Sequence, residues 1–424
     1  MGALLRGVTS LGVLLTLLAT AGCSATETDL TDPPSEIRLG VIAPLTGPNA
    51  ELGRDQVRGA KLAAQLVNDD LDEDITAPLA AGAGLPGLDG ATVKIVVSDS
   101  KSDPGTAAQA AAQLVREERT HGLVAGGDDA LTAAVSQRSE MLRIPLVDGH
   151  NSADYLTQLG HDWFFRTAPT SRKIGEMLLS FLGRQRSKGQ PTRRIAVLHA
   201  ADSHGEQVAR TMEGLAADAG YHLVADVAFP PGASNLSRKV RRLQSADPEV
   251  LLTSASTADD ALTLTRALDG ARQPVLTWGP GFDSPGFAKA VGSAADDMFR
   301  AATWSTDLAD RHPAARRVAE LYSQRNDAPM TDIAAGAFTA VLTLAMAVDD
   351  AGSARPHQMR SALIAMRLPG KYTIMPWDGI QFGADGQNAG CAGIVEQWHG
   401  DQPRVVYPRE LARVEVAWPG SKAA

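Results

Sequence analysis

VKIVVSDSKSDPGTAAQAAAQLVREERTHGLVA, residues 93–125, has the pattern of one complete strand–helix–strand unit. Val93–Val97 is a short apolar run that is typical of a buried strand. Asp103 and Pro104 then indicate the start of a helix. An Asp at the N-cap accepts hydrogen bonds from backbone N–H groups of the first turn, and a Pro at the first helical position loses no helical hydrogen bond by lacking an N–H. The apolar run Leu123–Ala125 predicts the next strand. A strand, a helix and a strand in this order predict a parallel sheet covered by helices.

The same alternation continues on both sides of this stretch. Apolar runs predict strands at 37–42, 144–147, 163–166, 195–198, 221–227, 250–253 and 275–277, and helical spacing of apolar residues predicts helices between them and near Val341. A chain of 424 residues is too long for one ordinary core. We therefore expect an α/β protein with two doubly wound parallel sheets in separate lobes.

The N-terminus resembles an export signal. Arg6 is a short positive region, residues 11–19 are apolar, and Ala21 and Gly22 supply the small side chains that precede a cleavage site at Cys23. This layout is similar to the lipobox of bacterial lipoproteins, in which the cysteine carries the lipid. We expect a signal peptide at 1–22, a lipidated Cys23 and a linker at 23–36. The alternative is an uncleaved membrane anchor.

Composition restricts the kind of partner. The formal net charge of −9 argues against nucleic acid, because phosphate binding favours a basic face. Of the two cysteines, Cys391 would remain alone after lipidation of Cys23, and we expect a small buried side chain there. The glycines of 82–87 follow no strand, and the acidic run 69–74 lacks calcium-loop spacing. No cofactor and no metal site is therefore expected.

Five landmarks give the chain a resemblance to a known family. They are Ile37–Gly40 with Pro44–Gly47, Asp99 with Asp103–Pro104, Ile144–Val147 with Phe165–Arg166, Asp202–Gly205, and Gly379–Phe382 with Asp385–Gly386. In their order and spacing the chain resembles the solute-binding proteins of ABC transporters, in the branched-chain amino acid-binding group. The resemblance implies the type I periplasmic-binding fold, two lobes joined by a multi-strand hinge. It places 37–166 and 301–375 in the first lobe and 167–300 and 376–424 in the second.

The resemblance also implies where a ligand would bind. Family positions for the ligand carboxylate fall on residues 128–130 and on His150 and Ser152, while the usual Tyr becomes His204, a second aromatic becomes Ser256, and the usual acid becomes Gly281. With the neighbouring acid Asp148 and the strand-end Trp278, the candidate ligand-binding residues are Asp128, Asp129, Ala130, Asp148, His150, Ser152, Ser203, His204, Ser256 and Trp278.

Acidic residues dominate this set and restrict the ligand. Asp129 is expected to cap the helix that begins at Leu131, and Asp128 and Asp148 add negative charge nearby. A ligand carboxylate would be repelled there, so we expect a cationic ligand or a neutral one rich in hydrogen-bond donors, such as an amide or polyol. Alternatives remain for each of these residues. Asp128 and Asp129 could serve only as helix caps or turn residues, and the two histidines could be loop residues with hydrogen-bond partners in the protein. Trp278 could be a core residue.

The expected function is an extracytoplasmic, lipid-anchored receptor that captures a small polar solute, such as an amino acid or amide, and delivers it to an ABC permease with its ATPase. A ligand sensor with the same fold is an alternative. A hydrolase using Asp148, His150 and Ser152 is a third, but a nucleophile, base and orienting group on one short loop have no evident mutual geometry.

Overall fold

The computed structural model describes residues 34–69, 82–284, 286–310, 313–400 and 402–419. The expected signal peptide, Cys23 and nearly all of the expected linker lie outside these ranges. The account below concerns the two sheets and the segments that join them.

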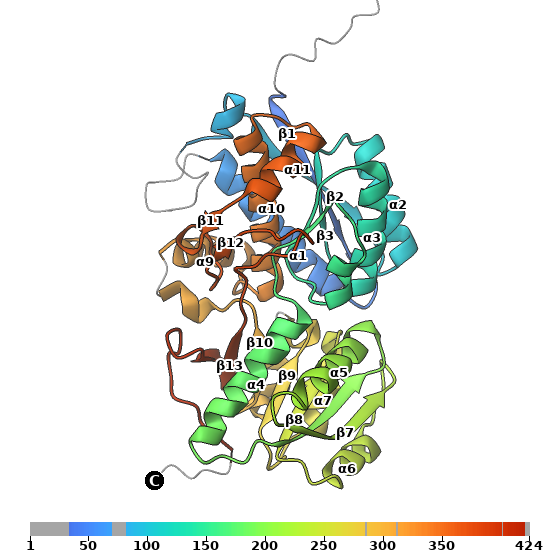
Figure 1. Ribbon diagram of the computed structural model, residues 1–424, viewed down its shortest axis with the longest axis vertical. Coiled ribbons are helices and arrows are strands. Elements are labelled where there is room, and N and C mark those ends of the chain that lie inside the picture. Colours follow the sequence, from blue (N-terminus) through green and yellow to red (C-terminus); the bar gives the residue numbers. More distant parts are fainter. Residues whose placement is uncertain (1–33, 70–81, 285, 311–312, 401, 420–424) are drawn as a thin grey trace, which may run out of the picture. The chain divides into compact units, whose positions relative to one another are not determined.

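The first lobe forms around a parallel sheet with strand order β2-β1-β3-β4-β5 (Figure 1). The apolar runs expected to be strands form this sheet, and Leu39 pairs with both Ile95 and Gly122 across it. The carboxyl ends of β3 and β4 lie next to each other, which brings the following loops together. The strands are β1 (Glu36–Ala43), β2 (Thr92–Asp99), β3 (Gly122–Ala125), β4 (Leu146–Asp148) and β5 (Phe164–Arg166).

Helices from both ends of the chain cover this sheet. Asp103 caps α2 as expected, accepting a hydrogen bond from the Thr106 N–H. The apolar helix α10 has the length and composition of a membrane span, but 94% of that window is buried, so it serves as a core helix among the described residues. Gly59 allows α1 to approach it closely, since a Cβ there would lie 2.0 Å from the Ala334 carbonyl oxygen. The helices are α1 (Ala50–Asn68), α2 (Pro104–Arg116), α3 (Asp129–Leu142), α9 (Pro313–Asn326), α10 (Asp332–Ala351) and α11 (Pro356–Ala365).

The second lobe is built on a sheet with order β14-β13-β10-β9-β8-β6-β7. Strands β6 to β10 run parallel, as expected from their alternation with helices, whereas β13 and β14 pair antiparallel at one edge. Its strands are β6 (Arg194–Ala200), β7 (His222–Phe229), β8 (Val250–Ser254), β9 (Val275–Trp278), β10 (Phe299–Ala302), β13 (Ile394–His399) and β14 (Gln402–Tyr407). Its helices are α4 (Ser171–Ser187), α5 (Ser203–Ala216), α6 (Ser237–Gln244), α7 (Ala258–Ala267) and α8 (Phe287–Val291), with the 3₁₀ helix η3 at Pro280–Asp283.

Within the described ranges the chain passes between the sheets after β5, after β10 and before β13. The first and last of these passages are bonded together, because the Arg166 N–H donates to Gly386 and the Asn388 N–H donates back to Arg166, each at 2.9 Å. The buried Arg166 side chain adds a bond from Nε to Gln387 at 2.7 Å. These segments form the hinge.

The expected boundary of the second lobe at residue 376 stays a prediction. Trp377, Ile380 and Phe382 pack in the same core as Leu39 of the first sheet. The short strands β11 (Leu368–Pro369) and β12 (Gly379–Ile380) pair with each other, and the chain joins the second sheet only at β13. The same core also contains Ile394 and Val405 of the second sheet, so packing alone does not assign residues 377–382 to one lobe.

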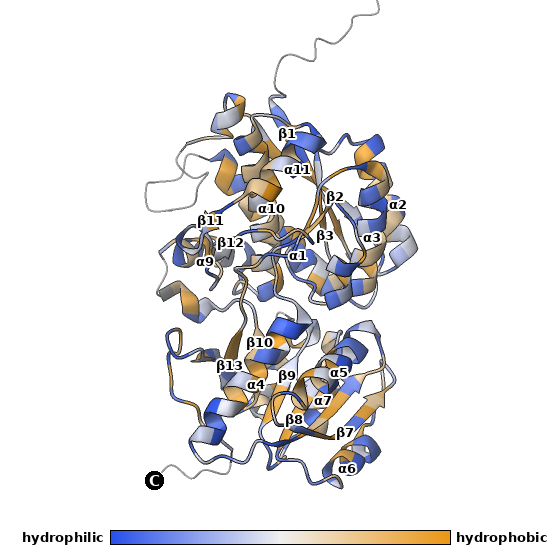
Figure 2. Ribbon diagram, in the orientation of Figure 1, coloured by the Kyte–Doolittle hydropathy of each residue, from blue (hydrophilic) through white to orange (hydrophobic). Residues whose placement is uncertain are grey.

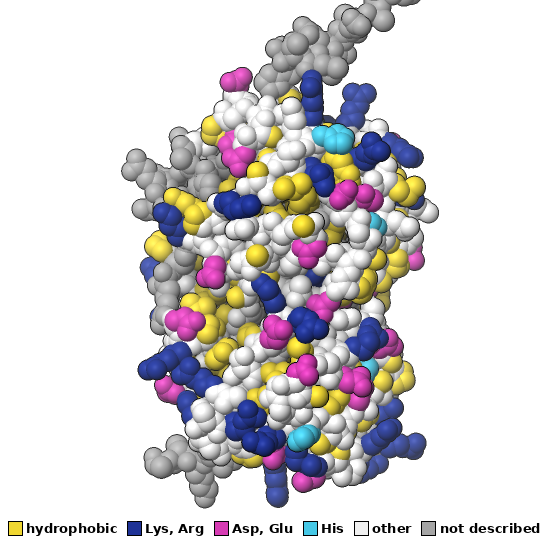
Figure 3. All heavy atoms as spheres, in the orientation of Figure 1, with side chains coloured by type: hydrophobic (Ala, Val, Ile, Leu, Met, Phe, Trp, Pro, Cys, Tyr) yellow, Lys and Arg dark blue, Asp and Glu magenta, His cyan; other side chains and the backbone are white. Residues whose placement is uncertain are grey.

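Strands and helices differ in hydropathy. The strands of both sheets are mainly hydrophobic and the helices are mixed (Figure 2). On the face shown in Figure 3, basic and acidic side chains are interspersed.

Cys391 is buried as expected, and burial raises the pKa of its thiol, so it behaves as a small core side chain.

Candidate functional site

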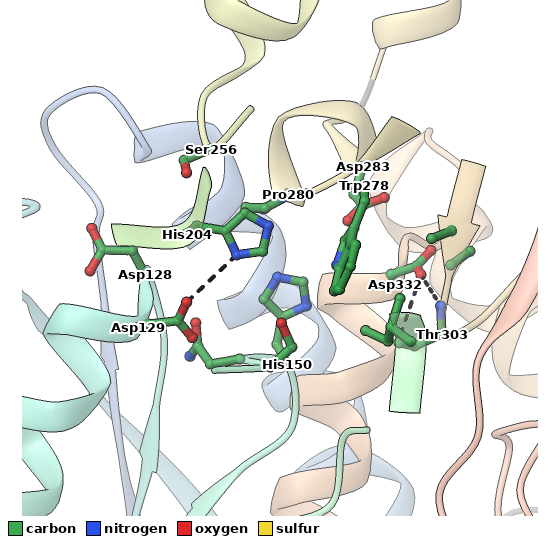
Figure 4. A pocket seen from close by; sticks show the side chains of 16 residues that line it. Asp128, Asp129, His150, His204, Ser256, Trp278, Pro280, Asp283, Thr303 and Asp332 are labelled. Atoms are coloured by element: carbon green, nitrogen blue, oxygen red, sulfur yellow. Dashed lines mark hydrogen bonds and ion pairs between the residues drawn. The ribbon is translucent and has the colours of Figure 1, made fainter. Parts of the chain in front are cut away.

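A pocket of about 540 Å³, its open mouth included, lies where the strand ends of both lobes face each other. The first lobe contributes the loops after β3 and β4 and the start of α10. The second lobe contributes the start of α5, the loops after β8 and β9, and the end of β10 (Figure 4). The lining residues are Asp128, Asp129, His150, Asn151, Ser152, Ile174, His204, Ser256, Trp278, Gly279, Pro280, Asp283, Ala301, Ala302, Thr303 and Asp332.

The start of α3 differs from expectation in one respect. Asp128, not Asp129, is the N-cap, and its carboxylate accepts the Leu131 N–H at 2.9 Å. Asp129 is therefore free of the capping role, and its buried side chain points across the pocket. Burial raises the pKa of Asp128. Burial alone would also raise that of Asp129, but the hydrogen bond and charge of His204 lower it overall. Asp129 is thus a buried, ionised group of the site.

Asp129 and His204 form a contact between the lobes. The Asp129 Oδ2 atom lies 3.5 Å from His204 Nδ1, and Figure 4 shows the two side chains pointing toward each other. His204 is held by the first turn of α5, where Asp202 accepts the Gly205 N–H at 2.8 Å. The Trp278 ring stands edge-on to the imidazole at 6.4 Å. Trp278 is both a pocket wall and a core residue, so its two expected roles coincide.

The loop after β4 is shaped by a carboxylate that does not line the pocket. Asp148 is fully buried, and its Oδ1 accepts the N–H groups of His150 at 3.0 Å and Asn151 at 3.2 Å. Its effect on the site is to fix the loop that presents His150. Burial lowers the pKa of His150, which favours the neutral imidazole.

This loop does not form a hydrolytic triad. The Ser152 hydroxyl is 3.1 Å from the Ser171 hydroxyl, and Asp148 bonds the backbone of His150 rather than its ring. A nucleophile, a base and an orienting carboxylate would need mutual hydrogen bonds through their side chains. The expected hydrolase alternative therefore has no support in the geometry.

Two other predicted residues lie outside the lining. Ser203 is exposed on the first turn of α5, and Ala130 is half-buried in α3. Leu52, at a family packing position, lines a neighbouring pocket of about 460 Å³. That pocket shares Asp128 and His150 with the first, so the two are parts of one cleft.

Acidic residues that sequence reasoning missed close the other side of the pocket. Asp283 follows the expected acid position by two residues, and Asp332 is the first residue of α10 after its N-cap Thr331. Arg300 binds both, at 2.6 Å and 3.1 Å. The Thr-Asp pair before a long apolar run was a visible helix-start signal. The sequence did not show that this helix start would lie beside the end of a strand that is distant in the sequence.

Several buried polar atoms in the pocket have no hydrogen-bond partner among the described residues: His150 Nδ1, His204 Nε2 and the Ser256 hydroxyl. Buried polar groups are normally paired, since leaving one unpaired costs about 1–3 kcal/mol. The three residues line the same pocket, His150 from the first lobe and His204 and Ser256 from the second. The arrangement suits a polar molecule that both donates and accepts hydrogen bonds.

Replacing Asp148 with Asn should change how stability depends on pH. Burial raises the pKa of Asp148 from 3.8 to about 6, against the opposing effect of the His150 N–H bond. The folded state then binds more protons than the unfolded state, so the wild-type chain loses stability as pH rises through about 6. We expect Asp148→Asn to be more stable than wild type by about 1–3 kcal/mol near neutral pH, with the gap closing near about pH 4.

Urea denaturation across this pH range measures that difference. Asp103→Asn, at an exposed cap remote from the pocket, is the matched control and should give a nearly constant difference from wild type. Parallel stability curves for wild type and Asp148→Asn would show that Asp148 stays ionised throughout.

The fold and the pocket between its lobes define a class of protein that binds a small solute between two hinged halves. Comparisons with known proteins agree. A family model described as periplasmic binding protein matches residues 36–402, so the chain belongs to that family. A Leu/Ile/Val-binding protein homolog of Brucella abortus is 24% identical over 397 residues, covering 91% of this chain and 94% of the relative. A second such homolog, from Brucella suis, is 25% identical, covering 93% and 96%.

Solved structures show the same fold. A leucine-binding protein from Thermotoga maritima has a TM-score of 0.73 at 17% identity, covering 87% of this chain and 97% of that one. A branched-chain amino acid-binding protein from Streptococcus pneumoniae, in complex with isoleucine, has a TM-score of 0.73 at 19% identity, covering 88% and 100%. A solute-binding protein from R. palustris in complex with benzoate has a TM-score of 0.72 at 18% identity, covering 92% and 100%. The predicted family and fold class are therefore confirmed.

Proposed function

We propose that this protein is the solute receptor of an ABC transporter, tethered outside the cytoplasm by a lipid on Cys23. Capture of a solute between hinged lobes is the family's activity, and a ligand that contacts both lobes stabilises the closed state. The tether rests on the lipobox-like sequence alone. Labelling of the chain with radioactive palmitate tests it.

The observation that supports the ligand class is the charge of the pocket wall. Four carboxyl side chains line it, those of Asp128, Asp129, Asp283 and Asp332, and neither Lys nor Arg is among its described lining residues. Arg300, behind the wall, engages two of the four, while Asp129 faces only His204 across the cleft. A carboxylate ligand would have few partners here. We infer a cationic solute or a neutral one rich in hydrogen-bond donors.

The expected role is a receptor, not an enzyme. The three loop residues that suggested hydrolysis do not contact one another as a catalytic group would. The candidate ligand contacts are Asp128, Asp129, His150, Ser152, His204, Ser256 and Trp278, with Asp148 as a positioning residue behind them. The family and its transporter relatives support delivery to a permease rather than signalling.

Leucinamide and leucine form a matched pair that tests the ligand class, because they differ only in an amide or a carboxylate. We expect leucinamide to bind at least about tenfold more tightly than leucine in isothermal titration, which corresponds to about 1.4 kcal/mol. Asp129→Asn should reduce this preference, since it removes the buried charge, while Asp103→Asn should leave it unchanged.

Mass spectrometry of small molecules released from the purified, denatured protein identifies the natural solute directly. A cation, an amide or a polyol would support the proposed class. Retention of leucine or another carboxylate, or tighter titration by leucine than by leucinamide, would contradict it.

A further inference from the structure

A second cavity, of about 930 Å³ with its mouth, lies on the other side of Asp283 and Asp332 from the cleft. Its walls come from η3 and α8, from β10 and the hinge residues after it, from the loop before α10, and from β13. The two acids belong to both linings, so they separate this cavity from the proposed solute site. Its residues are otherwise different from those of the cleft.

The cavity wall holds more negative than positive buried charge. Arg300 is surrounded by three carboxyl groups: Asp283 at 2.6 Å, Asp332 at 3.1 Å, and Glu396, whose Oε2 lies 2.8 Å from Nε. The three acid side chains are 9% exposed or less. Lys289 also lines the cavity but is exposed. One buried guanidinium faces three carboxyl groups, and burial raises the pKa of two of them, Asp283 and Glu396, so a cation in the cavity would favour their ionised forms.

Two buried polar atoms on this wall lack partners. Glu396 Oε1 and Trp398 Nε1 make no hydrogen bond of good geometry within the described ranges. Burial raises the pKa of the Glu396 carboxyl, while the charge of Arg300 and the nearby Ser305 hydroxyl act in the opposite direction. The two residues are separated by one position on β13, so their side chains leave the strand on the same face. An ionised carboxylate only accepts and an indole only donates. One hydroxyl group could satisfy both.

Four aromatic residues also line the cavity. Phe282, Phe287, Trp304 and Trp398 line the cavity, and the Phe287 ring lies 5.7 Å from that of Trp398. Faces of such rings attract cations, and quaternary ammonium groups in particular are recognised by aromatic cages. Arg300 already bonds one oxygen of each carboxyl group, and the second oxygen of Asp332 accepts the N–H groups of Thr303 and Trp304, while Glu396 Oε1 remains a buried acceptor without a partner in the described ranges.

We propose that this cavity is a second ligand site, separate from the cleft, for a small quaternary ammonium ion that carries a hydroxyl group. The ammonium lies against the aromatic rings near the carboxyl groups. The hydroxyl donates to Glu396 Oε1 and accepts from Trp398 Nε1. The shared wall of Asp283 and Asp332 would couple its occupancy to that of the cleft.

Titration of the full chain with choline and with tetramethylammonium, which lacks the hydroxyl, tests the site. We expect choline to bind about tenfold more tightly than tetramethylammonium. Trp398→Phe keeps a ring but removes the indole N–H, and it should abolish this preference. Trp163→Phe, at a tryptophan outside the cavity, is the matched control and should keep it.

Glu396→Gln should also weaken choline binding, with its folding checked by circular dichroism. If that variant does not fold, Trp398→Phe decides, because it removes no side chain that hydrogen-bonds Arg300 and keeps a ring where Arg300 lies over Trp398, 6.0 Å from the ring centroid. Absence of choline binding to the folded wild-type protein, equal binding of the two ions, or an unchanged preference in Trp398→Phe would each overturn the proposal.

Discussion

Replacing Arg300 with Leu should lower the free energy of unfolding by about 3–5 kcal/mol, as expected when one partner of a buried ion pair is removed. The guanidinium holds Asp283, Asp332 and Glu396 in a region where each is 9% exposed or less. Without it, three carboxyl groups from separate segments must be protonated or drawn toward water. Urea denaturation of wild type and variant measures the loss.

The loss should be larger at about pH 8 than at about pH 5. Burial raises the pKa of Asp283 and Glu396 even in the wild-type protein, with the charge of Arg300 opposing it. Removing Arg300 raises these pKa values further, so the folded variant binds more protons than the unfolded chain and loses stability as pH rises. Arg317→Leu, at a 40% exposed side chain 4.0 Å from Glu320, should cost about 0.5 kcal/mol or less. Equal losses at both pH values would contradict this account.

Replacing Gly149 with Ala should both destabilise the protein and weaken ligand binding. A Cβ at Gly149 would lie 2.0 Å from the carbonyl oxygen of Gly336, so backbone must move. The affected segments are the loop that carries His150 and the first turns of α10, where Asp332 lines the cleft. We expect a loss of about 2–4 kcal/mol, in the upper range of overpacking substitutions.

Gly214→Ala is the matched control. Gly214 lies on the exposed side of α5, with nothing within 4 Å of an added Cβ. The substitution should be neutral or stabilising by up to about 1 kcal/mol, because Ala favours the helix. Thermal unfolding and titration with leucinamide give the two readouts. A Gly149→Ala variant as stable as Gly214→Ala would show that the loop and helix move apart without cost.

The fold could be predicted from local patterns because each strand–helix unit carries its own sequence signals. The strand at 93–97, the Asp103 cap and the next strand are all formed as expected. Local patterns were less informative about which lobe an irregular segment joins. Nothing in the apolar residues of 377–382 distinguishes packing on the first sheet from packing on the second, and they share one core with residues of both sheets.

The candidate site was predicted where residues directly follow strands, and missed elsewhere. Asp128, His150 and Trp278 line the cleft because the carboxyl ends of parallel strands meet at one edge. Asp332 reaches the same place from the start of a helix about two hundred positions later in the chain than Asp128. Which of two adjacent acids caps α3 depended on backbone geometry that the sequence does not specify.

Three connecting segments restrict how the two lobes can move relative to each other. Two of them are hydrogen-bonded together at Arg166 and Asn388, and the third follows β10. Parallel covalent straps resist torsion and sliding while permitting flexion about a line across them. We therefore expect the lobes to open by bending across these connections, and we expect closing to bring His204 back opposite Asp129, so that the geometry of the closed site is reproduced at each closure.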